Sequence, residues 1–179
     1  MTPPDRLDLP PETIARIDEL VAHYPDGQQR SAVLMVLHEI QHALGFIPED
    51  AVRWTAARLG MAPIQVLEVV TFYPGFHQAP PGRFHFRVCR TLSCAMAGSH
   101  DLMQRLCEMK GIDLGQLHGH RNAVLVSADG EVSVEFAECL AACAFGPVCM
   151  VNDDTHQHVT ADKAAALLDE YRRKATTPH

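Results

Sequence analysis

Four of the six cysteines form two close pairs, and their thiols are the side chains in this sequence best suited to chemistry. Cys89 and Cys94 have four residues between them, whereas Cys139 and Cys143 have three. Thiolate is a soft ligand that suits iron, so each pair can hold one iron ion and two pairs can hold a two-iron cluster. Apolar neighbours could shield such a site from water: Leu92, Leu140, Ala141, Ala142 and Phe145.

Structural zinc is the main alternative, because four cysteines also make a tetrahedral zinc site. Zinc-binding loops usually place two residues between the thiols, and neither pair has that spacing. A dithiol oxidoreductase uses a C-x-x-C motif, which the sequence lacks. The spacing therefore favours iron–sulfur chemistry over structural zinc, with redox-active or inert thiols as the remaining interpretations.

The other two cysteines lie in apolar segments. We expect Cys107 and Cys149 to pack in the core, where a free cysteine behaves as a small hydrophobic side chain. Cys149 is close enough in sequence to Cys143 to allow an exchange of ligands. Disulfides are not expected, because the sequence indicates a reducing compartment.

Histidines offer a second possible metal site. His38, Glu39 and His42 form an H-E-x-x-H motif, which marks zinc metalloproteases when a third ligand follows. The extended metzincin pattern does not follow it, so a chance match on a helix is the favoured interpretation. Two further close pairs are interpreted as residues of solvated loops: His118 with His120, and His156 with His158.

Composition narrows the functional class. Apolar residues make up 47% of the 179 residues and charged residues 21%, which suits a globular protein with a hydrophobic core. The net charge is −7 without a basic block, so nucleic acid and anionic membrane surfaces are poor partners. The first ten residues resemble no secretory signal, and no segment has the ~20 apolar residues of a membrane span. We therefore expect a soluble, cytoplasmic protein.

The periodicity of apolar residues changes near residue 80. Before it, apolar residues recur at helical spacing, which predicts a small bundle of four helices over 12–24, 29–44, 49–59 and 63–72. After it, alternating residues predict strands over 84–88, 123–126, 132–134 and 147–152, with helices over 100–109 and 161–173. The expected division is a helical bundle domain, 1–80, and a small α/β domain, 81–179.

With these residues in view, the sequence resembles the small [2Fe–2S] subunit of bacterial NADH:quinone oxidoreductases, respiratory complex I. The likeness covers nearly the whole chain. It rests on segments 31–34, 60–63 and 68–73 in the helical half and on the two cysteine segments 88–94 and 138–143, followed by Pro147.

The resemblance implies an α/β fold in which an N-terminal helical bundle precedes a thioredoxin-like [2Fe–2S] ferredoxin domain. It implies one [2Fe–2S] cluster, no catalytic side chains of the chain's own, and these cluster ligands: Cys89, Cys94, Cys139 and Cys143. It also implies that the helix carrying H-E-x-x-H holds no zinc.

The same resemblance implies a role in electron transfer. The chain would exchange single electrons with FMN on a partner subunit that binds NADH, beside further subunits, at the cytoplasmic side of the inner membrane and without a span of its own. Related modules serve NAD-linked hydrogenases and formate dehydrogenases, so these complexes are alternatives. A zinc-stabilised interaction module is the alternative from another class.

Departures from the family pattern are modest. Ala141 stands where many relatives have Gly, so we expect the backbone to avoid a positive φ there. Gly146 stands where Ala is expected, Cys149 is additional, and segment 115–122 is longer than in close relatives. None of these departures removes a cluster ligand.

Overall fold

The computed structural model describes residues 7–117 and 124–176, and the chain divides into two compact units, Met1–Pro80 and Pro81–His179. His118 and His120 lie outside the described residues. Within the described part, no helix has both the length and the apolar character needed to cross a lipid bilayer.

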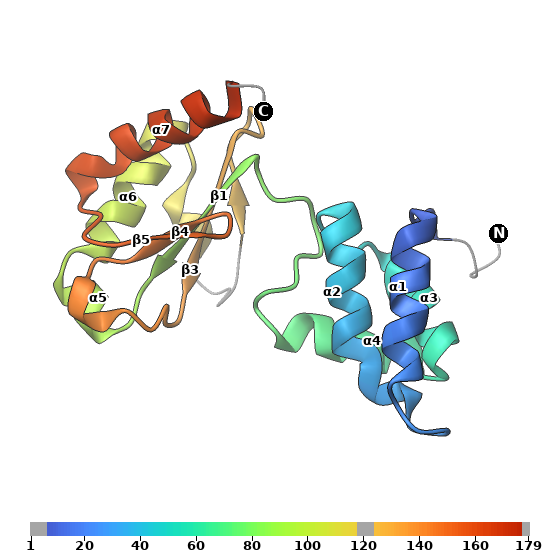
Figure 1. Cartoon of the computed structure of the whole chain (residues 1–179). Helices are drawn as coiled ribbons and strands as arrows, with labels where there is room; N and C mark the ends of the chain where they lie inside the picture. The colour runs from blue at the N-terminus through green and yellow to red at the C-terminus, as the bar shows by residue number, and fades with distance from the viewer. Residues whose placement is uncertain (1–6, 118–123, 177–179) are drawn as a thin grey trace. The chain divides into compact units, whose positions relative to one another are not determined.

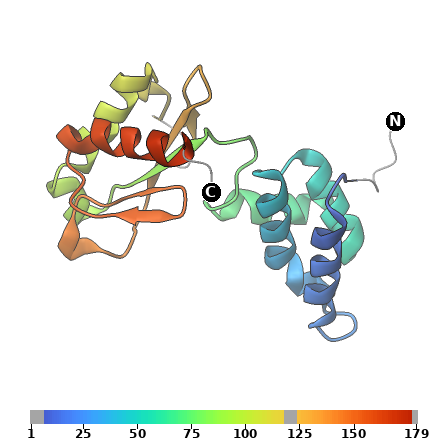
Figure 2. The ribbon, with the colours of Figure 1, turned by 45° about the horizontal axis from the view of Figure 1, so that its top comes forward.

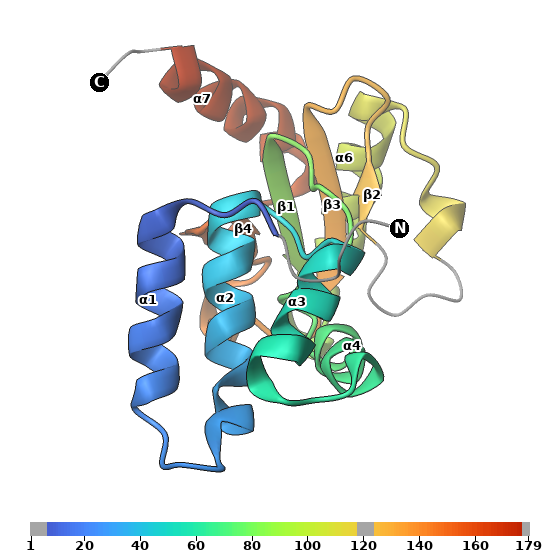
Figure 3. The same ribbon diagram turned by 90° about the vertical axis from the view of Figure 1, so that its right-hand side faces the viewer.

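The first unit consists of α-helices joined by short turns (Figure 3). They are α1 (Pro11–Ala22), α2 (Val33–Leu44), preceded by the 3-10 turn η1 (Gln29–Ala32), α3 (Glu49–Leu59) and α4 (Pro63–Phe72). Helices α2 and α3 each end at a glycine in the left-handed conformation, Gly45 and Gly60, which a side chain would disfavour. Their apolar faces meet in one core that includes Ile17, Val36, Leu37, Ile40 and Val66.

The polar residues of α2 hold the segment that leaves α4. The Gln41 side chain donates to the Gly75 carbonyl (2.7 Å) and accepts from the His77 amide (2.8 Å). The His38 ring packs on Phe76 with centroids 4.8 Å apart. Among the described residues, neither His38 nor His42 belongs to a group of three possible metal ligands. In this motif, His38 therefore packs on the segment after α4, and Glu39 lies 3.8 Å from Arg16 of α1.

The second unit is built on a five-stranded mixed sheet with the order β2-β3-β1-β4-β5 (Figure 1). Strands β1 (Phe84–Cys89) and β3 (Val132–Ala137) are parallel, and the other neighbours are antiparallel. The edge strands are β2 (Leu125–Val126) and β5 (Asp154–His156), and β4 (Cys149–Val151) lies between β1 and β5. A parallel pair needs a crossover connection. The connection from β1 contains α5 (Leu92–Met96), α6 (Ser99–Lys110) and η2 (Leu114–Leu117) before the chain returns through β2.

One face of the sheet carries the core. Helices α6 and α7 (Ala164–Thr176) pack against this face (Figures 1 and 2). Alternate residues of β1, Phe84, Phe86 and Val88, meet α6 and α7 there, as the period of two requires. The close approach of Gly82 to β3 requires glycine, because a Cβ atom would lie 2.6 Å from the Val132 carbonyl carbon.

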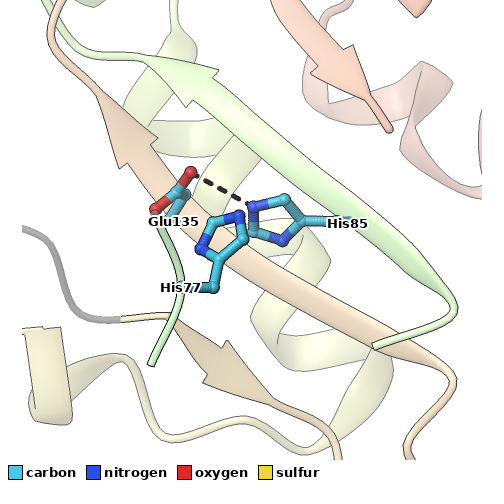
Figure 4. Close-up of side chains that lie close together, drawn as sticks. All are labelled: His77, His85 and Glu135. Atoms are coloured by element: carbon cyan, nitrogen blue, oxygen red, sulfur yellow. Dashed lines mark hydrogen bonds and ion pairs between the residues drawn. The ribbon is translucent and has the colours of Figure 1, made fainter. Parts of the chain in front are cut away.

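The opposite face of the same two strands carries a polar chain, part of which Figure 4 shows. His85 Nε2 lies 3.1 Å from Glu135 Oε1, and its Nδ1 lies 2.7 Å from Ser133 Oγ. A carboxylate only accepts, so a neutral His85 carries its proton on Nε2 and accepts from the Ser133 hydroxyl at Nδ1. This chain fixes the pairing of β1 with β3 from the polar side.

Two short elements of the structure, the strand β5 and the helix α5, were not predicted from the sequence. Because β5 pairs with β4, His156 lies on a strand and contacts the Tyr171 hydroxyl (2.8 Å), so its interpretation as a solvated loop residue is wrong. Each element is too short to show a period, which is why apolar spacing did not reveal it.

Candidate metal centre

The two cysteine segments leave the sheet at the same edge. In the parallel pair, Cys89 is the last residue of β1 and lies opposite Ala137, the last residue of β3. The Arg90 amide extends the pairing by donating to the Ala137 carbonyl (3.0 Å). Because the carboxyl ends of parallel strands meet at one edge, residues 89–94 and 138–143 become neighbours although about 50 residues separate them in the sequence.

The first pair is buried. Cys89 and Cys94 are each 2% exposed and pack with Val148 in a small apolar cluster. Cys94 lies in α5, so this helical turn folds the chain back after Arg90 and brings the second thiol beside the first. The Thr91 hydroxyl lies 3.3 Å from the Cys89 sulfur.

The second pair is exposed. Cys139 follows β3, and Cys143 begins the 3-10 turn η3 (Cys143–Phe145). The Ala141 amide donates to the Cys139 sulfur (3.3 Å). The expectation that Ala141 avoids a positive φ is wrong, because its φ is 55°. The tight turn that directs this amide at the sulfur uses the left-handed conformation, which a methyl side chain tolerates at a cost of about 1–2 kcal/mol.

An ion pair connects the two cysteine segments. Arg90, next to Cys89, contacts the carboxylate of Glu138, next to Cys139. Surface ion pairs contribute little stability on average, and Glu138 is more than half exposed. The pair therefore serves mainly to align the two segments, a role that the sequence did not reveal because the partners are 48 residues apart.

Electrostatic surroundings differ between the two buried thiols. Burial raises the pKa of Cys89, but hydrogen bonds from the Thr91 hydroxyl and from the Leu140 and Thr91 backbones outweigh it, so the pKa lies below its usual value. Burial and the neighbouring Cys89 and Cys143 sulfurs raise the pKa of Cys94, although a backbone hydrogen bond from Val148 opposes this. Of these two thiols, Cys89 is therefore the one that loses its proton more readily.

The remaining cysteines lie elsewhere. Cys107 and Cys149 belong to the core between the sheet and its helices. Burial raises the pKa of Cys107 to about 11 and that of Cys149 to about 12, so both stay neutral thiols at ordinary pH. The prediction that both pack as hydrophobic residues is confirmed, and Cys149 is fully buried in that core.

The donor set of this site suits a two-iron cluster, because four thiols come as two pairs from two segments that meet at one edge of the sheet. Two pairs of thiols with backbone amides directed at them suit two irons, whose thiolates such amides stabilise.

Comparison with protein families gives one match over most of the chain. The family described as thioredoxin-like [2Fe-2S] ferredoxin matches residues 17–172. This span includes the four cysteines of the two pairs and most of the helical unit.

Curated relatives are similar over most of their length. The chain is 35% identical over 153 residues to NADH-quinone oxidoreductase subunit 2 of Thermus thermophilus, covering 85% of this chain and 80% of the relative. It is 35% identical over 156 residues to a subunit of the NADH-quinone oxidoreductase of Rhizobium meliloti, covering 87% of this chain and 86% of the relative.

A solved structure shows the same fold. A chain of an NAD+-reducing [NiFe]-hydrogenase matches 82% of this chain with a TM-score of 0.64 and 21% identity. This chain spans only 24% of the length of that hydrogenase chain. The similarity supports the α/β architecture with its helical first unit, and it concerns the fold alone.

Proposed function

The chain belongs to the thioredoxin-like [2Fe–2S] ferredoxin family, and on that premise we propose that it is the electron-transfer subunit of an NADH:quinone oxidoreductase. One [2Fe–2S] cluster would be held by Cys89, Cys94, Cys139 and Cys143. The observation that carries the proposal is the meeting of both cysteine pairs at the carboxyl ends of β1 and β3. When bound, the cluster supplies one-electron redox chemistry.

Each pair of ligands has its own task in this proposal. The buried pair, Cys89 and Cys94, excludes water and is fixed by the sheet and by Val148. The exposed pair, Cys139 and Cys143, brings the other side of the site to the protein surface, where an electron has a short path to a partner. Arg90 and Glu138 keep the two segments in register.

The proposed partner is the subunit that binds FMN and NADH. NADH delivers two electrons as a hydride, whereas the cluster accepts one, so a flavin must stand between them. The sequence contains neither a G-x-G-x-x-G motif nor a P-loop for a nucleotide. Apolar side chains beside the exposed pair suit a docking surface, since Leu92 is 75%, Met96 81% and Phe145 46% exposed.

Assembly with such a complex determines the proposed location. The chain would lie at the cytoplasmic side of the inner membrane, bound through its partner subunits. The second candidate is the same role in an NAD-linked hydrogenase, since a chain of such a hydrogenase has a similar fold. The names of the curated relatives favour the quinone-reducing complex over it.

Metal and acid-labile sulfide analysis of protein purified without oxygen tests the cluster. We expect about two irons and two sulfides per chain and an EPR signal only after reduction. A colourless protein with one zinc ion and no sulfide would contradict the proposal and support the zinc-stabilised interaction module.

The role in the complex has its own test. Tagged chain is purified together with the proteins it binds and then mixed with NADH. We expect FMN in the preparation and reduction of the cluster by NADH, while the isolated chain is reduced by dithionite and not by NADH. Co-purification of nickel with hydrogen-dependent reduction of the cluster would point to the hydrogenase instead.

A further inference from the structure

Thr91 occupies the N-cap position of α5 without capping the helix. A threonine at this position ordinarily accepts a hydrogen bond from a backbone amide of the first helical turn. In α5 the Thr91 side chain makes no such bond, and its hydroxyl instead lies 3.3 Å from the Cys89 sulfur. The usual structural reason for threonine at the start of a helix is therefore absent here.

The direction of this hydrogen bond follows from the chemistry of the sulfur. As a free thiol, Cys89 can donate or accept, but a thiolate that ligates iron can only accept. The Thr91 hydroxyl must then be the donor. Because Cys89 is 2% exposed, water does not compete strongly for the same sulfur.

We propose that Thr91 is a positioning residue. Its hydroxyl donates a hydrogen bond to the Cys89 thiolate and thereby raises the reduction potential of the cluster. The inference rests on the proposed function, since it requires the cluster. One-electron reduction adds a negative charge that the thiolate ligands share, so a donor to sulfur stabilises the reduced state more than the oxidised state.

The neighbouring Ser93 provides a matched control. It also lies between the two buried ligands and carries a hydroxyl, but it is exposed. Among the hydrogen bonds of the described residues, none involves the Ser93 side chain. A comparison of the two positions therefore separates the hydrogen bond to sulfur from a general effect of changing this segment.

The experiment is a redox titration followed by EPR on the whole chain with its cluster. Thr91→Val keeps the branched shape and removes the donor, and we expect a five- to tenfold shift of the one-electron equilibrium toward the oxidised state. That shift corresponds to a midpoint potential lower by about 40–60 mV, because tenfold equals about 59 mV for one electron. Thr91→Ser keeps the hydroxyl donor, so its one-electron equilibrium should stay within about twofold of that of the wild type. The same is expected of Ser93→Ala.

A second measurement observes the proton itself. In protein exchanged into D₂O and reduced, the Thr91 hydroxyl deuteron should give a coupling in pulsed EPR spectra, beside those of backbone amides. The coupling should be present in wild type and in Thr91→Ser and absent from Thr91→Val. If Thr91→Val assembles no cluster, Thr91→Ala provides the same comparison, and wild type without this coupling overturns the inference by itself.

The outcomes distinguish the inference from the proposed function. A wild-type chain without two irons and two sulfides contradicts both. A wild-type chain with the cluster, combined with an unchanged potential and unchanged deuteron couplings in Thr91→Val, contradicts the role of Thr91 and leaves the cluster in place. An equal drop in potential in Ser93→Ala also overturns the inference, because it would show a nonspecific effect of the segment.

Discussion

The two cysteine segments have similar lengths and leave the same edge of one sheet, yet they differ in almost every physical property. Cys89 and Cys94 are buried, and backbone and side-chain donors from three segments reach their sulfurs. Cys139 and Cys143 are exposed, and Cys139 receives the Ala141 amide from its own turn. This asymmetry suggests a division of labour in which one pair anchors the site and the other faces the partner.

The strongest test of this asymmetry replaces one ligand at a time by serine. We expect Cys94→Ser to lose the cluster, because its buried position gives the site no room to recruit another ligand. Cys139→Ser and Cys143→Ser should retain a cluster with an altered spectrum, since water or the serine oxygen can reach the exposed iron. Iron and sulfide content and visible spectra measure both results.

A buried cysteine outside the site serves as the control. Cys107→Ser should leave the iron and sulfide content unchanged, because Cys107 lies in the core between α6 and the sheet. Equal loss of the cluster in all three ligand variants would remove the proposed difference between the anchoring and the exposed pair.

The second test concerns the core residues of β1 that hold the anchoring segment, residues 89–94, in place. Phe86 is fully buried on β1, three residues before Cys89. Phe86→Ala should lower the free energy of unfolding of the sheet unit by about 3–5 kcal/mol, the usual cost of such a cavity. Leu92→Ala, in the anchoring segment but 75% exposed, should change it by less than about 0.5 kcal/mol. Denaturant titrations followed by circular dichroism give both values, and similar losses would contradict this assignment of support.

The helical half shows which helix bounds the spacing of apolar residues can predict. Helices predicted over 49–59 and 63–72 agree with α3 and α4, because glycine or proline marks their ends. The cysteine pairing was also visible, since spacing alone indicated two pairs. In contrast, the last predicted helix begins as the 3-10 turn η4 (Ala161–Lys163) before α7, a distinction that apolar spacing does not carry.

The contacts within the site could not be predicted from the sequence, because they depend on strand register and turn geometry. The Arg90–Glu138 ion pair depends on the register of β1 against β3, which no local pattern specifies. The left-handed Ala141 is another example, because the requirement comes from the turn that directs its amide at Cys139. Thr91 could have been noticed as a hydroxyl between two candidate ligands, but only the structure shows that it does not cap α5.

The end of β3 far from the cysteines is held by charged side chains, and these predict a pH dependence of stability. Arg172 and Lys110 bind Glu131, just before β3, and lower the pKa of its carboxyl from 4.5 to about 2. A lowered carboxyl pKa means that the stabilisation is complete above about pH 4.5 and is lost as the pH falls toward about 2. We expect a loss of about 1–2 kcal/mol across that window after allowance for solvent screening.

Glu131→Gln tests this assignment. The variant should be less stable than wild type at pH 7 and should lose less stability between pH 5 and pH 3, as measured by denaturant titration at each pH. Glu12→Gln, at an exposed position of α1, should follow the wild-type curve. An unchanged pH dependence in Glu131→Gln would assign the acid sensitivity to other carboxyl groups.

The smallest expected effect lies in the exposed segment itself. Ala141 has a φ of 55°, which glycine adopts without strain, whereas the adjacent Ala142 has a φ of −121°. Ala141→Gly therefore removes about 1–2 kcal/mol of strain and adds about 0.5–1 kcal/mol of chain entropy to the unfolded state, while Ala142→Gly only adds the entropy. Because the entropy cost is common to both, the two variants should differ by about 1–2 kcal/mol in stability, with Ala141→Gly the more stable. The rate at which an iron chelator bleaches the cluster provides a second measure, and faster bleaching in Ala141→Gly than in Ala142→Gly would show that the left-handed turn at the exposed pair is not strained.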